Sequence, residues 1–184
     1  MHKNQFDIDT QIHNGLKPYR DLVAWVDRLI GDVRRKYPAD ITCHQGCDCG
    51  CRNLSIFPIE ALSVFVAIRE LPTETAATIR QRAIANSIWD CPLLEDRACG
   101  LYPFRPIICR THGLPLQTKF NGRPSVGYCR HNFKNRPAIP RDAVIDLDGI
   151  NNLLRDVNAA LVPYLSRQMP ARLSIAAAIH LRLR

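Results

Sequence analysis

Four cysteines stand close together in one short segment. They fall within the nine residues from 43 to 51, together with Gly46 and Gly50. The faces of helices and strands repeat about every 3.6 and 2 residues, so neither gathers four side chains at this spacing. We therefore expect an irregular loop, with φ > 0 at both glycines. Thiolates bind Zn²⁺, Cu(I) and iron–sulfur clusters, which predicts a metal centre; the alternatives are a disulfide knot or buried free thiols. The four residues are Cys43, Cys47, Cys49 and Cys51.

A second set of four cysteines lies further along the chain. Their spacing is too irregular for tandem zinc fingers, but each is expected where a helix, turn or strand ends. Such boundaries let distant segments meet at one point. Eight thiolates could serve two centres, or six or seven could serve one centre beside a redox or structural thiol, and the sequence does not decide. These residues are Cys91, Cys99, Cys109 and Cys129.

Arginines and histidines accompany the cysteines. A guanidinium group beside a thiolate lowers the pKa of the thiol and offsets the charge of a bound cluster. On this ground we assign Arg52 and Arg110 as cofactor-binding residues, whereas chance explains Arg130 equally well. Histidine is the commonest alternative ligand, although for each histidine here a place on the surface or beside a ligand is the favoured interpretation. The first candidate is His112, because Cys109 and His112 would share one face of a short helix; the other two are His44 and His131.

Length and composition indicate one domain, residues 1–184, with an ordinary apolar core, since 46% of its residues are hydrophobic. The first residues lack the apolar stretch of a signal peptide, and no run is long enough to span a membrane. We therefore expect a cytoplasmic protein without membrane contact, in a compartment where clustered thiols indicate metal or redox chemistry. The net charge of +8 is scattered, so nucleic-acid binding is not expected, while a protein partner stays open.

The sequence predicts mostly helical secondary structure around the cysteines. Apolar periodicity predicts flanking helices within 15–37 and 146–184, the latter broken at Pro170 and resuming from Arg172 to Leu183. Between them we expect helices starting at Pro58, Thr73 and Pro106, and a hairpin over 116–128 with its turn at 121–122. Residues 1–14 read as a loosely held arm, and 34–36 as a solvated helix end. The predicted fold is mainly α with a small β-hairpin, and a loop-rich cysteine metal site flanked by helices.

Three segments carry a resemblance to a known family. Cys91-Pro92-Leu93-Leu94, Cys99-Gly100-Leu101-Tyr102 and Arg105-Pro106-Ile107-Ile108-Cys109-Arg110 resemble the signature of the YkgJ-type cysteine-cluster family, described as zinc- or iron-chelating domains. In the first cluster Cys43, Cys47 and Cys51 align with the family pattern, but Gly50 replaces the first member of a double cysteine and Cys49 precedes it. The resemblance covers residues 43–130, which we take as the metal-binding core. It implies bound iron–sulfur or zinc and little about a reaction.

The sequence thus predicts a metal-binding protein that holds an iron–sulfur cluster through its eight cysteines. The favoured cluster type is [4Fe–4S], and the expected role is in redox chemistry or electron transfer. The alternative is a zinc-binding structural or interaction module without catalysis. No paired carboxylates stand near the cysteines in the sequence. No reaction is therefore assigned, and enzymatic activity stays open.

Overall fold

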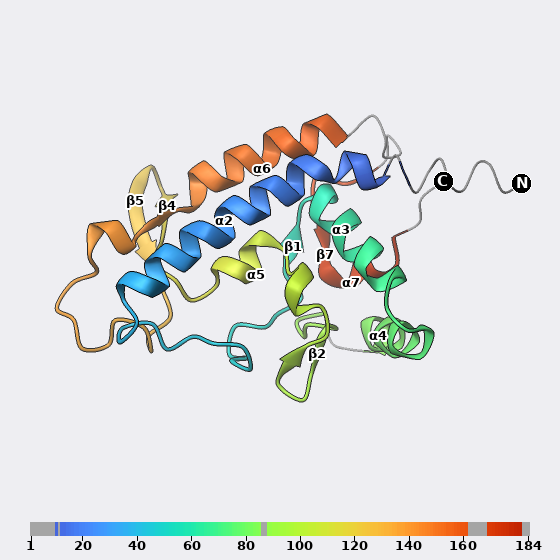
Figure 1. Ribbon diagram of the computed structural model, residues 1–184, viewed down its shortest axis with the longest axis horizontal. Coiled ribbons are helices and arrows are strands. Elements are labelled where there is room, and N and C mark those ends of the chain that lie inside the picture. Colours follow the sequence, from blue (N-terminus) through green and yellow to red (C-terminus); the bar gives the residue numbers. More distant parts are fainter. Residues whose placement is uncertain (1–9, 11, 86–87, 162–168, 182–184) are drawn as a thin grey trace, which may run out of the picture.

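A computed structural model describes residues 10, 12–85, 88–161 and 169–181 (Figure 1). About half of the chain is helical, and the strands form small sheets of two or three. The fold is therefore mainly α, as predicted. None of the helices in the described part of the chain is both long and apolar enough to cross a membrane.

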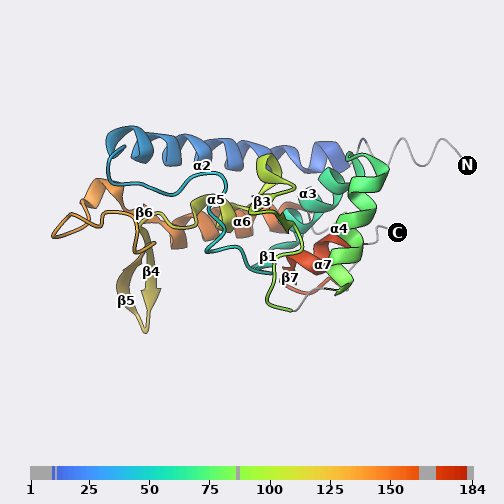
Figure 2. The same ribbon diagram turned by 90° about the horizontal axis from the view of Figure 1, so that it is seen from below.

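Two long helices lie side by side in both ribbon views (Figures 1 and 2). They are α2 (Lys17–Lys36) and α6 (Leu147–Leu161), close to the predicted bounds, although residues 162–168 of the second predicted helix lie outside the described residues. Buried side chains three or four positions apart on each helix share one hydrophobic cluster, because that spacing lines one helical face. These are Leu22, Val26, Ile30, Val33, Ile150 and Leu154.

A second hydrophobic cluster joins three further helices, α3 (Pro58–Arg69), α4 (Thr73–Ala85) and α7 (Ile175–Ile179). The first two begin where the sequence predicts; the predicted end of α4 at Asn86 lies outside the described residues. The predicted helix from Arg172 to Leu183 is wrong at its start and its end. Strand β7 (Leu173–Ser174) instead pairs antiparallel with β1 (Ser55–Ile56), and α7 starts only after Ser174, whose hydroxyl accepts the Ala177 N–H at 3.1 Å.

The remaining strands are short. β2 (Leu94–Glu95) pairs with β3 (Ala98–Cys99), while β4 (Leu116–Phe120) pairs with β5 (Arg123–Gly127) and, in parallel, with β6 (Ile145–Asp146). The β4–β5 hairpin turns at Asn121 and Gly122, both at positive φ, as the Asn-Gly pair predicts. Figure 2 shows this hairpin standing away from the helices. Two 3₁₀ turns, η1 (Tyr102–Phe104) and η2 (Arg141–Ala143), complete the described elements.

Two local expectations near α2 are wrong in part. Residues 12–15 are helical rather than a loosely held arm; residues 1–9 and 11 lie outside the described residues. The solvated end of α2 is confirmed for Arg35 and Lys36, which are exposed, and is wrong for Arg34, which is half-buried and donates to the Cys43 carbonyl at 2.7 Å. The last turn of α2 therefore holds the start of the cysteine segment.

A buried carboxylate links two helices. Glu60 is only 2% exposed, and its two oxygens accept the Phe57 N–H and the Ile107 N–H, each at 2.9 Å. Phe57 is the N-cap residue of α3, and Ile107 is the first residue of α5 (Ile107–Thr111). Burial raises the pKa of the Glu60 carboxyl above its usual value. Glu60 thus fixes the position of α5, which carries Cys109, against α3.

Replacing Glu60 by alanine is expected to destabilise the protein strongly. It leaves two backbone N–H groups without their partner, at about 1–3 kcal/mol for each group that stays buried. Chemical denaturation of Glu60→Ala, compared with Glu74→Ala on the exposed first turn of α4, measures the difference. Equal unfolding free energies in the two variants would show that Glu60 is not a structural link.

Candidate metal centre

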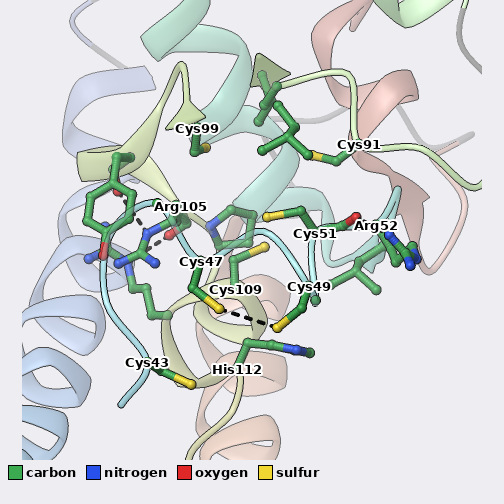
Figure 3. Close-up of a pocket in the computed structure, with 18 of the residues that line it drawn as sticks. Cys43, Cys47, Cys49, Cys51, Arg52, Cys91, Cys99, Arg105, Cys109 and His112 are labelled. Atoms are coloured by element: carbon green, nitrogen blue, oxygen red, sulfur yellow. Dashed lines mark hydrogen bonds between the residues drawn. The ribbon is translucent and has the colours of Figure 1, made fainter. Parts of the chain in front are cut away.

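All eight cysteines line one cavity of about 90 Å³, and Figure 3 labels seven of them, all except Cys129. They arrive from the loop 43–51, the β2–β3 segment, α5 and the residues after β5. Every one of them is a free thiol. Segments that are distant in sequence therefore meet around this cavity, while the role of the thiols as metal ligands stays a prediction.

Two of the sulfur atoms approach one another closely. The Sγ atoms of Cys47 and Cys49 are 3.3 Å apart, and burial, with a smaller contribution from Cys129, raises the pKa of the Cys43 thiol. In the described part of the chain, no three Cys, His, Asp or Glu side chains converge tightly enough to coordinate one ion as they are positioned.

Three of the thiols have a strongly raised pKa. Burial raises the pKa of Cys91 to about 11 and that of Cys109 to about 12. The hydrogen bond with Cys47 raises the pKa of Cys49 to about 11. Thiolates at these positions therefore require a cation that replaces the protons, which is how thiol sites take up metal ions.

Arg105 is the basic residue whose charge acts on the cysteines most directly. It lowers the pKa of Cys51 and of Cys99 against the dominant effect of burial. Its guanidinium lies 3.6 Å from the centre of the Tyr102 ring, and its Nε donates to the Tyr102 carbonyl at 3.0 Å. Figure 3 shows it among the residues that line the cavity. Sequence reasoning assigned no role to Arg105; its place four residues before Cys109 was the available signal.

The two arginines assigned from the sequence also line the cavity but have other partners. Arg52 is exposed and donates to the Cys51 carbonyl at 2.9 Å. Arg110 donates from Nη1 to both carboxylate oxygens of Asp27 at 3.0 and 2.8 Å, and from Nε to the Arg105 carbonyl at 2.7 Å. Arg110 therefore ties α5 to α2, with its charge balanced by Asp27.

Asn132 holds the cysteine loop in place. It is fully buried, and its Oδ1 accepts the backbone N–H of Thr42 at 2.9 Å and that of Cys43 at 3.3 Å. Its Nδ2 donates to the Gly113 carbonyl at 2.6 Å and to the Cys43 sulfur at 3.3 Å. One amide thus joins three segments at the cavity. Sequence reasoning missed it, since one asparagine near Cys129 carries no distinctive pattern.

Of the two loop glycines, only Gly46 has the positive φ that the sequence predicts for both. Gly46 has φ +95° as expected, but Gly50 does not have a positive φ. A Cβ at Gly50 would lie 1.8 Å from Nε2 of His112, so the space for a side chain is filled by that ring. Gly113 has φ +87°, and a Cβ there would lie 2.7 Å from the Cys43 sulfur. Close approach therefore requires glycine at 50 and 113.

The histidines occupy three different positions. His112 lies at the cavity but just after α5 ends, so the predicted sharing of a helix face with Cys109 is wrong. His44 also lines the cavity, with its Nδ1 2.8 Å from the Thr42 carbonyl. His131 lines a neighbouring, more open cavity together with Tyr128 and Arg130.

Comparison of the chain with protein-family models, curated proteins and solved structures gives no match. The site must therefore be interpreted from its own residues.

Replacing Gly50 by alanine should disturb the cysteine loop. The new Cβ overlaps the His112 ring, and such overpacking typically costs about 1–3 kcal/mol. Adding His112→Ala to the variant removes the overlap and should restore most of the unfolding free energy, measured by denaturation. Gly127→Ala, where a Cβ would meet nothing within 4 Å, is the control. A double variant no more stable than Gly50→Ala would contradict this account of the glycine.

Proposed function

We propose that this chain is a metal-binding protein that holds an iron–sulfur cluster of the [4Fe–4S] type through its cysteine thiolates. The observation that carries the proposal is the meeting of eight free thiols, from segments far apart in sequence, around one cavity. Such a donor set suits soft metal centres. The resemblance of residues 43–130 to YkgJ-type domains, which no family-model match accompanies, points to the same kind of centre. We further propose that the protein acts in the reducing cytoplasm, where these thiols remain free.

The size of the cavity and the spacing of the loop favour a cluster over a lone zinc ion. One water position takes roughly 10–15 Å³ on this measure of volume, so a cavity of about 90 Å³ has room for several atoms. Structural zinc is enclosed by four ligands that commonly come as paired C-x₂₋₄-C units. Cys43/Cys47 and Cys47/Cys51 each have such a spacing, but Cys49 lies between them, so four thiols crowd into one loop.

The chain also provides the surroundings that a redox centre uses. Burial and nearby charge set the reduction potential of a cluster. Leu54, Leu93 and Ile175 supply apolar wall, and Arg105 supplies a positive charge. When bound, the cluster would supply one-electron chemistry; the protein would exclude water from it and balance its negative charge. An electron-transfer role fits this arrangement.

Purification without oxygen tests the proposal. The expected product is coloured, with iron and acid-labile sulfide in equal amounts and a sulfide-to-iron charge-transfer band. A colourless protein with stoichiometric zinc would instead support the alternative, a zinc-binding structural or interaction module. A protein that carries neither metal, even after reconstitution with ferrous iron and sulfide, would overturn the proposal.

Cys109→Ser is expected to lose most of the bound metal and part of the folded stability, since metal-binding energy is folding energy in such sites. The control is Thr111→Ser, a buried residue of the same helix that does not line the cavity. Metal analysis and thermal denaturation of both variants give the comparison. Full metal content in Cys109→Ser would exclude Cys109 as a ligand.

Arg105→Gln should make the cluster harder to reduce, because removal of a nearby positive charge disfavours the more negative reduced state. Its reduction potential is expected to fall further than that of Arg52→Gln, whose exposed guanidinium is screened by solvent and salt. Arg105→Lys keeps the charge and should recover part of the shift. Redox titration of the four proteins measures it. Equal potentials in all of them would show that Arg105 does not tune the centre.

A further inference from the structure

The eight thiols fall into two groups of four according to their surroundings. Four of them belong to, or pack against, the hydrophobic cluster formed by α3, α4 and α7. We call these the inner group: Cys51, Cys91, Cys99 and Cys109. The other four belong to neither hydrophobic cluster. We call these the outer group: Cys43, Cys47, Cys49 and Cys129.

Contacts within each group support the division. The Sγ atoms of Cys47 and Cys49, both in the outer group, are 3.3 Å apart. The four inner cysteines share one hydrophobic cluster. In Figure 3, Cys91 and Cys99 lie at one end of the cavity, and Cys43 lies at the opposite end with His112.

The loop geometry separates the two groups at one turn. The Cys51 N–H donates to the Asp48 carbonyl at 2.9 Å, which turns the chain between Cys49 and Cys51. The Asp48 carboxylate forms a salt bridge with Arg97, a residue of the β2–β3 turn, with 3.4 Å between Oδ2 and Nε. The turn leaves Cys51 packed against the apolar cluster and Cys49 exposed. Although its four thiols are close together in sequence, the loop therefore contributes Cys43, Cys47 and Cys49 to the outer group and Cys51 to the inner group.

The two groups differ in the exposure of one thiol each and in their polar contacts. In the outer group Cys49 is exposed, and Cys49 and Cys129 also line the neighbouring cavity with His131. The buried amide of Asn132 donates to the Cys43 sulfur. In the inner group Cys91 is buried among leucine and isoleucine side chains, while the other three members of each group are half-buried.

We propose that the eight cysteines form two metal centres, an enclosed one held by the inner group and a solvent-accessible one held by the outer group. The proposal rests on the proposed metal-binding function. Each group supplies four thiolates, the full set for one [4Fe–4S] cluster or one zinc ion. The outer centre exchanges its metal with solvent more readily, and the inner centre is retained.

Replacement of two cysteines in each group is the direct test. Cys43→Ser/Cys129→Ser and the matched inner variant Cys91→Ser/Cys99→Ser are purified without oxygen and reconstituted with ferrous iron and sulfide. Metal content is measured, and alkylation followed by mass spectrometry shows which thiols are protected. The outer variant should retain about half of the metal, with Cys47 and Cys49 alkylated and all four inner cysteines protected. The inner variant should show the reverse if it folds.

The unaltered protein gives a second measurement that does not depend on folding of a variant. A chelator should remove its metal in two phases, with the thiols of the outer group becoming alkylated first. A single phase, or a folded outer variant that loses all of its metal or none, would overturn the division while leaving the metal-binding function intact. An unaltered protein that binds no metal would instead overturn both.

Discussion

The cysteine loop lacks regular secondary structure, so its backbone depends on hydrogen bonds from elsewhere. Buried peptide groups are costly unless they are paired. Arg34 from α2 donates to the Cys43 carbonyl, and Asn132 accepts the N–H groups of Thr42 and Cys43. At the exit of the loop, Arg52 forms a β-bridge with Asp90, after α4. One partner therefore comes from a helix and two come from irregular segments, which together hold the loop that carries half of the thiols.

Helix α5 has a central place in this arrangement. It is only five residues long, too short to be stable alone, yet it carries Cys109 and is anchored on two sides. Glu60 fixes its first N–H to α3, and Arg110 ties its last turn to Asp27 of α2. Ile107 packs in one hydrophobic cluster and Cys109 against the other. The short helix thus joins the two halves of the core at the edge of the cavity.

Local chemistry made much of the fold predictable. Pro58 and Thr73 mark helix starts because their preferences act within one turn, and Asn121-Gly122 defines its hairpin for the same reason. Contacts between distant residues were not predictable. The β1–β7 pair, the amide of Asn132 and the ring of His112 over Gly50 each depend on segments that meet only in the folded chain. The convergence of the cysteines was inferred from thiol chemistry, while the effect of Arg105 required its position in space.

The separation of the thiols along the chain has a consequence for biosynthesis. Ribosomes deliver the loop 43–51 long before Cys129, and β1 before its partner β7. Domains generally fold as units, so a nascent chain exposes unpaired sulfur atoms until its later segments arrive. Under the function proposed above, metal delivered at that stage would meet incomplete sets of donors. Loading of the proposed centres would therefore follow completion of the chain.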